Sequence, residues 1–279
     1  MSSTRSVEEW LDKIENDRNI YILYASEVGS RAYGLASPDS DNDVRFIFIG
    51  RSVDEYILEK VPDTITMFSE DKMYDFVGFE LRKAIKLYRS GNCSLVELLS
   101  SKIIHRENQF VPRIIELKID GLHVMDAYMS LSKGMRKQLN EERAEYGVSL
   151  KKYFYVIRTA AILQWYNERV GRVWLGGENN SLVFTTPPLD FQTLIGELKF
   201  SEEVKRALGE LFLIKTTQPR DTRIKERVAC IDEWIDGVIE SFEPNRYSIK
   251  GLENLRSVYG EQKIVEDLIL TTVHAYSPI

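Results

Sequence analysis

Two short apolar runs, residues 19–25 and 44–49, most constrain how this chain can fold. Both are rich in β-branched and aromatic residues, which is typical of buried strands. One or two further strands are predicted over residues 63–77. After residue 78 the apolar residues recur at helical spacing. Their stripe consists of Leu81, Ala84, Ile85 and Tyr88.

The pattern becomes mostly helical after about residue 125. The clearest helix begins near residue 150 and has an apolar stripe over four turns. We therefore expect an α+β domain over residues 1–125, followed by a mainly α-helical domain over residues 126–279. The stripe consists of Leu150, Phe154, Ile157, Ala161 and Trp165.

The charge balance excludes a protein that is uniformly basic. The chain has 37 Lys and Arg residues against 43 Asp and Glu residues, a net charge of −6, whereas domains held to nucleic acid by bulk charge are usually basic. The 43% of hydrophobic residues also excludes a disordered chain. Residues 130–160 nevertheless form a basic group that is expected to contact phosphates. Its cations are Lys133, Arg136, Lys137, Arg143, Lys151, Lys152 and Arg158, and its acids are Glu141, Glu142 and Glu145.

Nothing in the sequence indicates secretion or a membrane. The N-terminal residues are charged and lack the apolar core of a signal peptide, and no apolar run is long enough to span a bilayer. The two cysteines, Cys93 and Cys230, have no neighbouring residues at metal-ligand spacing and are predicted to be buried thiols. We therefore expect a cytoplasmic protein without a membrane partner.

The segment between the two apolar runs contains the residues best suited to chemistry. Gly29-Ser30 is followed, after ten residues, by Asp41-Asn42-Asp43. Glycine allows close backbone approach to a ligand, and a turn that opens a helix offers N–H groups to a phosphate. Two carboxylates at positions i and i+2 of an extended chain point to the same face, where they can hold magnesium beside substrate phosphates.

One simpler interpretation of the acidic residues remains, and a second one is a poor match. Asp, Asn and Ser are common in turns, so residues 38–43 could form only a polar turn. A calcium-binding loop is a poor match, because such a loop has glycine at its sixth position, where this chain has Val44. The order of strand, Gly-Ser turn, spacer, Asp-x-Asp and second strand is more specific than any of its parts.

The string Gly29–Phe46 resembles the signature of the DNA polymerase β-like nucleotidyltransferase superfamily. Within it, the chain is similar to the RNA-repair-pathway DNA polymerase β family, also called predicted nucleotidyltransferases. The segments 78–84, 91–101, 151–158 and 187–191 fit the same branch. The resemblance covers about residues 20–195, and it implies a mixed sheet with flanking helices.

The resemblance implies transfer of a nucleoside monophosphate from a nucleoside triphosphate to an acceptor, with release of pyrophosphate. Gly29 and Ser30 would hold the triphosphate. Asp41 and Asp43 would bind metal, two Mg²⁺ or Mn²⁺ ions in this superfamily. A third acid usually comes from a later strand, and the candidates are Asp75, which we prefer, and Glu80. Glu80 could instead cap the following helix.

Several cations are candidates for the nucleotide site. Arg31 and Arg45 flank the acidic pair, and each could bind a phosphate or simply neutralise the aspartates. Lys151, Tyr155 and Arg158 lie at i, i+4 and i+7 of a predicted helix, on a face other than its apolar stripe. Two cations around an aromatic ring suit a nucleotide, although solvated helix faces often look the same.

The acceptor and the oligomeric state are not readable from these residues. The family name suggests an RNA end as acceptor, which is an argument by analogy. One alternative is transfer onto a protein partner, as in minimal nucleotidyltransferase antitoxins. Another is a regulatory module that binds nucleotide without turnover.

Overall fold

The computed structural model describes residues 5–52, 61–109, 111–117, 119, 121–142, 146–169, 185–242 and 262–276. The chain divides into two compact units, the first made of Met1–Gly29, Asp41–Ile119 and Ser257–Ile279, the second of Ser30–Ser40 and Asp120–Arg256. The sequence-based division has a single break at residue 125. It therefore differs from this arrangement at the Ser30–Ser40 segment and at the C-terminal segment.

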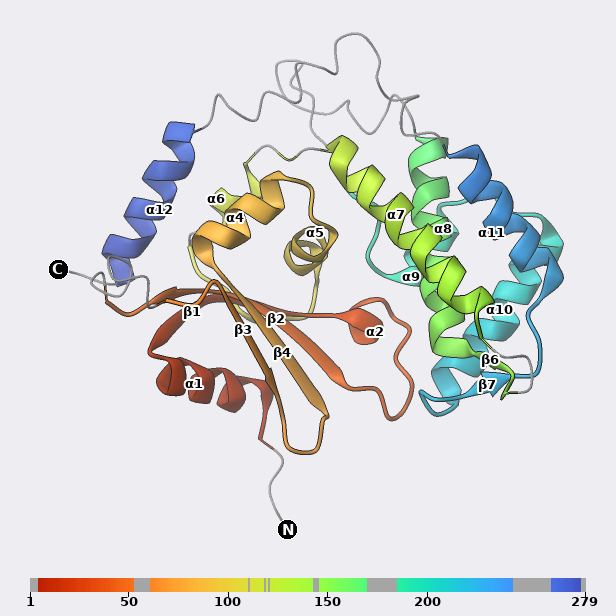
Figure 1. Ribbon diagram of the computed structural model, residues 1–279, viewed down its shortest axis with the longest axis horizontal. Helices are drawn as coiled ribbons and strands as arrows, with labels where there is room; N and C mark the ends of the chain where they lie inside the picture. The colour runs from red at the N-terminus through yellow and green to blue at the C-terminus, as the bar shows by residue number, and fades with distance from the viewer. Residues whose placement is uncertain are drawn as a thin grey trace, which may run out of the picture. The chain divides into compact units, whose positions relative to one another are not determined.

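A five-stranded mixed sheet with the strand order β3-β4-β2-β1-β5 forms the centre of the first unit (Figure 1). Strands β2 and β4 are parallel, and the other neighbours are antiparallel. The predicted α+β class with a mixed sheet is therefore confirmed. The strands are β1 (Ile20–Val28), β2 (Asn42–Gly50), β3 (Thr64–Phe68), β4 (Tyr74–Glu80) and β5 (Ile104–Arg106).

Helices cover both faces of this sheet (Figure 1). Helix α1 (Val7–Arg18) packs on one face, and its residues Leu11 and Ile14 join a core that includes Phe46 and Phe76. The other face is covered by α4 (Leu81–Arg89), α5 (Cys93–Ser100), α6 (Val111–Ile115) and α12 (Gln262–Tyr276).

Local sequence signals explain where two of these helices begin. Helix α1 begins with a capping box, in which Ser6 and Glu9 each accept a hydrogen bond from the other's backbone N–H. The predicted stripe of α4 is confirmed, because its members Leu81, Ala84, Ile85 and Tyr88 are all buried. The N-cap of α4 is Glu80, one of the two roles that the sequence suggested for it.

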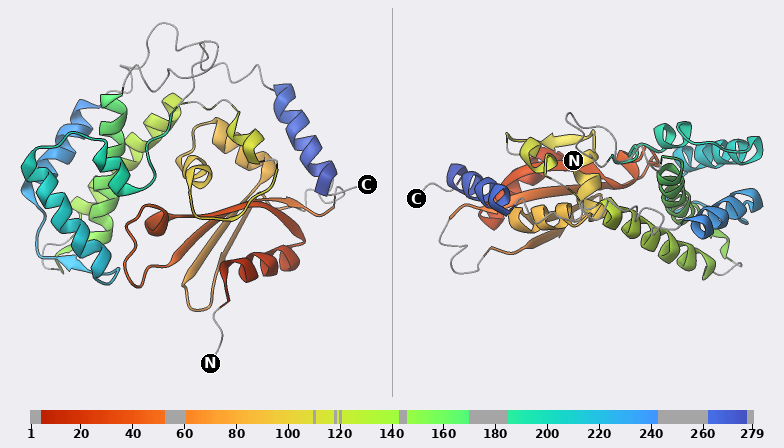
Figure 2. Two further views of the ribbon diagram at one scale, coloured as in Figure 1. Left: turned by 180° about the vertical axis from the view of Figure 1, so that it is seen from behind. Right: turned by 90° about the horizontal axis from the view of Figure 1, so that it is seen from above.

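The second unit is built around α8 (Leu150–Glu168), which lies between α7 (Gly121–Asn140) and α11 (Ala229–Ser241) in both broad views (Figures 1 and 2). All five residues of the predicted α8 stripe are buried. Helix α9 (Phe191–Gly196) also packs against α8, and α10 (Glu202–Thr217) packs against α11. A short turn, α2 (Gly29–Ala32), begins the Ser30–Ser40 segment, and β6 (Val148–Ser149) pairs with β7 (Arg223–Ile224).

The cysteines differ from their predicted environment. Cys93 and Cys230 are half-buried rather than buried, and each lies in the first turn of a helix, α5 and α11 respectively. Neither forms a disulfide. In the described part of the chain, no helix combines the length and the apolar composition needed to cross a membrane.

Candidate active site

Strands β2 and β4 place two carboxylates beside each other. Asp43 pairs with Asp75 in the parallel register of these strands. The register is set where the strands begin, because the Asn42 N–H donates to the Met73 carbonyl at 2.8 Å. Paired residues of neighbouring strands project to the same face of a sheet, so both carboxylates lie on one face.

Arg45 joins these two carboxylates. Its Nη2 lies 3.0 Å from Asp75 Oδ2 and 3.6 Å from Asp43 Oδ1. Its Nη1 donates to the carbonyls of Asp75 and Val44, at 3.1 and 3.2 Å, so the backbone also anchors the guanidinium. The structure shows the contact of Arg45 with the aspartates, and binding of a phosphate by Arg45 stays a prediction.

Gly29 allows the end of β1 to approach Asp43 closely. Its φ is +69°, in the left-handed region that glycine adopts without strain. A Cβ atom at this position would lie 2.1 Å from Asp43 Oδ2, closer than any side chain could be. The glycine of the motif therefore sets the distance between the backbone and the carboxylate.

The remaining candidate acids lie in different places. Asp41 is half-buried and immediately precedes β2. Glu80 pairs with Phe48, five residues along β4 from Asp75, and its Oε2 accepts the Arg82 N–H at 2.9 Å as the cap of α4. Glu80 is only 2% exposed, and burial raises the pKa of its carboxyl, with Arg82 opposing. The structure thus brings Asp75, and not Glu80, next to Asp43.

The acidic pair has donors that suit a divalent cation. Asp75 Oδ1 is buried and has no hydrogen-bond partner in the described part of the chain. Among the described residues, no group of three or more His, Cys, Asp or Glu is placed to hold a metal ion. Magnesium is commonly bound through one or two carboxylates, with water and substrate phosphates completing its coordination. Asp43 and Asp75 fit that donor set. The described residues do not provide enough ligands to hold a metal ion without water or substrate.

The other predicted nucleotide-binding residues belong to the second unit. Ser30 accepts the Leu35 N–H at 2.8 Å through its carbonyl, and Arg31 is exposed. Lys151 and Tyr155 are half-buried on α8.

Arg158 does not lie on a solvated helix face. It is 3% exposed, and its guanidinium carbon lies 3.6 Å from the centre of the Tyr33 ring. The expected grouping of Arg158 with Lys151 around Tyr155 did not anticipate this contact. Its physical reason is that other helices and the Ser30–Ser40 segment cover α8 on most sides, so that α8 has little solvated face. No local spacing indicates a contact with Tyr33, which is distant in the sequence.

Three cations of the basic group of residues 130–160, namely Arg136, Lys137 and Lys152, pair with acids. Arg136 makes two hydrogen bonds of 2.8 and 2.7 Å with Asp236 and one of 3.0 Å with Asp232. Lys152 pairs with Glu142 at 2.8 Å, while Arg143 and Glu145 lie outside the described residues. Acids of the same unit therefore bind these two cations, and a contact of the basic group with phosphates stays a prediction.

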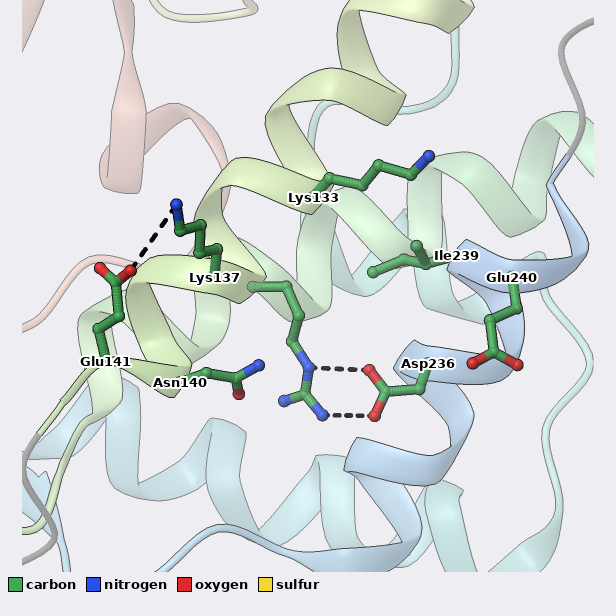
Figure 3. Close-up of a pocket in the computed structure, with 8 residues that line it drawn as sticks. Lys133, Lys137, Asn140, Glu141, Asp236, Ile239 and Glu240 are labelled. Carbon is green, nitrogen blue, oxygen red and sulfur yellow. Dashed lines mark hydrogen bonds and ion pairs between the residues drawn. The ribbon is translucent and has the colours of Figure 1, made fainter.

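A cavity of about 370 Å³ between α7 and α11 shows the same balance (Figure 3). Lys137 contacts Glu141 at its rim, at 3.9 Å. Three cations and three acids line this cavity, so it lacks the excess positive charge expected of a nucleic-acid channel. The lining residues are Lys133, Arg136, Lys137, Asn140, Glu141, Asp236, Ile239 and Glu240.

His105 links two acids in the first unit. Its Nε2 lies 3.1 Å from Glu27 Oε1, and its Nδ1 lies 3.3 Å from Glu8 Oε1. The hydrogen bond with Glu27 raises the pKa of His105, and burial opposes this effect. Glu27 is 3% exposed and adjoins Val28, whose strand partner is Asp43. Neighbouring strand residues face opposite sides, so the histidine cluster and the acidic pair lie on opposite faces of the sheet.

Comparisons with known proteins show the family of the chain. A family model described as the RNA repair pathway DNA polymerase beta family matches residues 4–256. "Uncharacterized protein YcgL" of Bacillus subtilis (strain 168) is 31% identical over 237 residues, which is 85% of this chain and 85% of that protein. The family match covers nearly all the described elements of both units. The chain therefore belongs to the RNA repair pathway DNA polymerase beta family.

Proposed function

We propose that this protein is a divalent-metal-dependent nucleotidyltransferase that moves a nucleoside monophosphate from a nucleoside triphosphate to an acceptor hydroxyl. Its family suggests nucleotidyl transfer. The observation that carries the proposal is the in-register pair of Asp43 and Asp75 on parallel strands, with an unsatisfied carboxylate oxygen on Asp75.

The residues of the first unit have distinct roles in this proposal. Asp43 and Asp75 would hold the metal, with Asp41 as a further carboxylate, and the metal would neutralise charge on the phosphates. Gly29 keeps the end of β1 close to Asp43, so that backbone N–H groups of the following turn can meet the triphosphate. Arg45 holds the two carboxylates in place by its own charge and its backbone anchors.

The reaction needs little covalent chemistry from the protein. The acceptor oxygen forms a bond to the α-phosphorus, the bond to the bridging oxygen breaks, and pyrophosphate leaves with the electron pair. The acceptor's proton passes to a base, for which a carboxylate of the acidic group is the candidate. Positioning and charge neutralisation supply most of the catalysis in phosphoryl chemistry.

An RNA end is the acceptor class that we propose, because the family is described by an RNA repair pathway. The test is incubation of the protein with Mg²⁺ or Mn²⁺ and each of the four labelled nucleoside triphosphates, against RNA, DNA and protein acceptors. We expect label on RNA and release of pyrophosphate. Label on a protein would show that the acceptor is a protein and not RNA. Binding of nucleotide without transfer would contradict the proposal that the protein is an enzyme.

The site assignment is tested in the same assay. The double variant Asp41→Asn with Asp43→Asn should lose transfer. Asp17→Asn is a matched control, since it removes one carboxylate from the exposed side of α1, where Asp17 pairs with Lys13. Pyrophosphate release that survives the double substitution would show that the chemistry takes place elsewhere.

A further inference from the structure

Helix α10 carries a buried lysine in the place of an apolar residue. The buried positions of this helix are Val204, Leu208, Leu211 and Lys215, at helical spacing. Lys215 is 5% exposed, and in the described part of the chain it has no carboxylate within ion-pair distance. Lysine is rarely buried without an ionic partner, because its ammonium loses hydration.

The hydrogen bonds of Lys215 explain what the ammonium does there. Its Nζ donates to the Leu35 carbonyl and to Ser37 Oγ, both at 2.7 Å. Ser37 Oγ donates in return to the Lys215 carbonyl at 2.9 Å. Ser37 is itself 6% exposed, so the three bonds form a buried clamp between α10 and the Ser30–Ser40 segment.

The electrostatic surroundings of Lys215 disfavour its charge, so stability alone does not explain why a lysine occupies this position. Burial lowers the pKa of its ammonium, the nearby Lys151 lowers it further, and Asp39 opposes these effects. An apolar side chain of similar length would avoid this desolvation and repulsion, and replacing buried charges by apolar groups is often neutral or stabilising. The residue is therefore better explained by what it holds.

Other contacts attach the same segment within the second unit. The Phe191 N–H donates to the Tyr33 carbonyl at 2.9 Å, and Arg158 stacks on the Tyr33 ring. The Arg220 N–H donates to Asp39 Oδ1 at 2.7 Å. The segment is thus bound at residues 33, 35, 37 and 39, and Lys215 takes part in three of these hydrogen bonds, two through its ammonium and one through its carbonyl.

We propose that Lys215 is a positioning residue for the nucleotide site, acting through Ser37 on the Ser30–Ser40 segment. This inference rests on the proposed function. Along the chain, the segment joins Gly29 to Asp41. Its conformation therefore affects how the chain continues into Gly29 at one end and into Asp41 at the other. A segment released from α10 would let Ser30 move from the position in which it meets the triphosphate. The clamp acts on binding of the nucleotide and touches no reacting atom.

The test compares two variants that break the clamp with one that does not. Lys215→Met keeps the length of the side chain and removes the ammonium, and Ser37→Ala removes the hydroxyl without changing α10. The control is Lys205→Met, which removes an exposed lysine from the same helix. Amide hydrogen exchange is followed by mass spectrometry over peptides that cover residues 30–40, and KM and kcat are measured for the nucleoside triphosphate.

We expect exchange in residues 30–40 to become about tenfold faster in Lys215→Met and Ser37→Ala, while α8 keeps its protection. The KM should rise by about the same factor with kcat changed less, and Lys205→Met should match the wild-type protein. Ser37→Ala keeps the test valid if Lys215→Met fails to fold. Unchanged exchange in a folded variant would overturn the clamp. Faster exchange with an unchanged KM would overturn the role of Lys215 in positioning the nucleotide site.

Failure of the proposed function is distinguishable from failure of the clamp. If the wild-type protein transfers no nucleotide to any acceptor, the proposed function is wrong, and the KM measurement is replaced by titration with ATP and Mg²⁺. Weaker ATP binding together with faster exchange in both variants would then still support the clamp. ATP binding as tight as in the wild-type protein in both variants would overturn the positioning role.

Discussion

Replacing Asp75 by Asn, with Glu80→Gln as its matched control, tests which carboxylate on β4 belongs to the site. Both changes replace a carboxylate by an amide of the same shape on the same strand. Asp75 pairs with Asp43, whereas Glu80 caps α4 five residues further along. The two variants therefore separate an effect on chemistry from an effect on the strand.

The structure sets the expected magnitudes for Asp75→Asn. In the wild-type protein, Arg45 Nη2 donates to Asp75 Oδ2 at 3.0 Å, and the amide oxygen of the variant can accept the same hydrogen bond. Since this ion pair is partly exposed, the loss of charge should cost about 1 kcal/mol of stability or less. A metal ligand is worth several kcal/mol in the transition state, so we expect transfer to fall by about 10²–10³-fold, or about 3–4 kcal/mol.

Glu80→Gln should behave in the opposite way. The amide oxygen can still accept the Arg82 N–H, and a neutral group avoids the desolvation that raises the pKa of the Glu80 carboxyl. We expect its stability to change by less than about 1 kcal/mol and its transfer rate to stay within about twofold.

The assay measures single-turnover transfer at saturating Mg²⁺, with urea unfolding of the same preparations. A loss of transfer in Glu80→Gln equal to that in Asp75→Asn would refute the geometric assignment of the third acid. Full activity in Asp75→Asn would refute it as well. The urea transition shows whether either variant has lost its fold, so that unfolding is not mistaken for a loss of catalysis.

Three further substitutions test other parts of the first unit. Gly29→Ala should destabilise the fold by about 1–2 kcal/mol, because alanine is strained in the left-handed backbone conformation of this position. It should also reduce transfer, because the new Cβ displaces Asp43. Unfolding and activity are measured on the same preparation. Arg45→Met should lower the melting temperature without metal and increase the stabilisation by added Mg²⁺, since Asp43 and Asp75 then repel each other; an unchanged Mg²⁺ effect would contradict this role. His105 has a pKa raised above its ordinary 6.5, so its contribution is fully present below pH 6.5 and is lost as the pH rises through the raised value. The stability difference between wild type and His105→Gln should therefore shrink from acidic to alkaline pH, and a constant difference would exclude the charged interaction.

The sequence predicted best those parts of the structure that depend on neighbours along the chain. The apolar stripes of α4 and α8 are buried as expected, because helical spacing alone decides which residues share a face. The preference for Asp75 over Glu80 as the acid beside Asp43 agrees with the register of β2 and β4, although its role in catalysis stays a prediction.

Polar residues with distant partners were predicted least well. The strand predicted over residues 19–25 is too short, because β1 continues to Val28. Ser26 is completely buried, and its hydroxyl donates to the Leu98 carbonyl at 2.8 Å. A buried polar group needs such a partner, and its partner lies 72 positions away, where no local pattern points to it.

Arg158 and Lys215 extend this reasoning to charged residues. Local spacing treats a cation on a helix as exposed, because burial of an unpaired charge is unfavourable. In the second unit both cations are buried against one segment, Ser30–Ser40, which supplies an aromatic ring to one and two oxygen acceptors to the other. That segment carries the serine of the motif and ends immediately before Asp41. The helical unit therefore departs most from its sequence pattern where it binds the segment that joins the two halves of the motif, and departures of this kind are expected at functional sites.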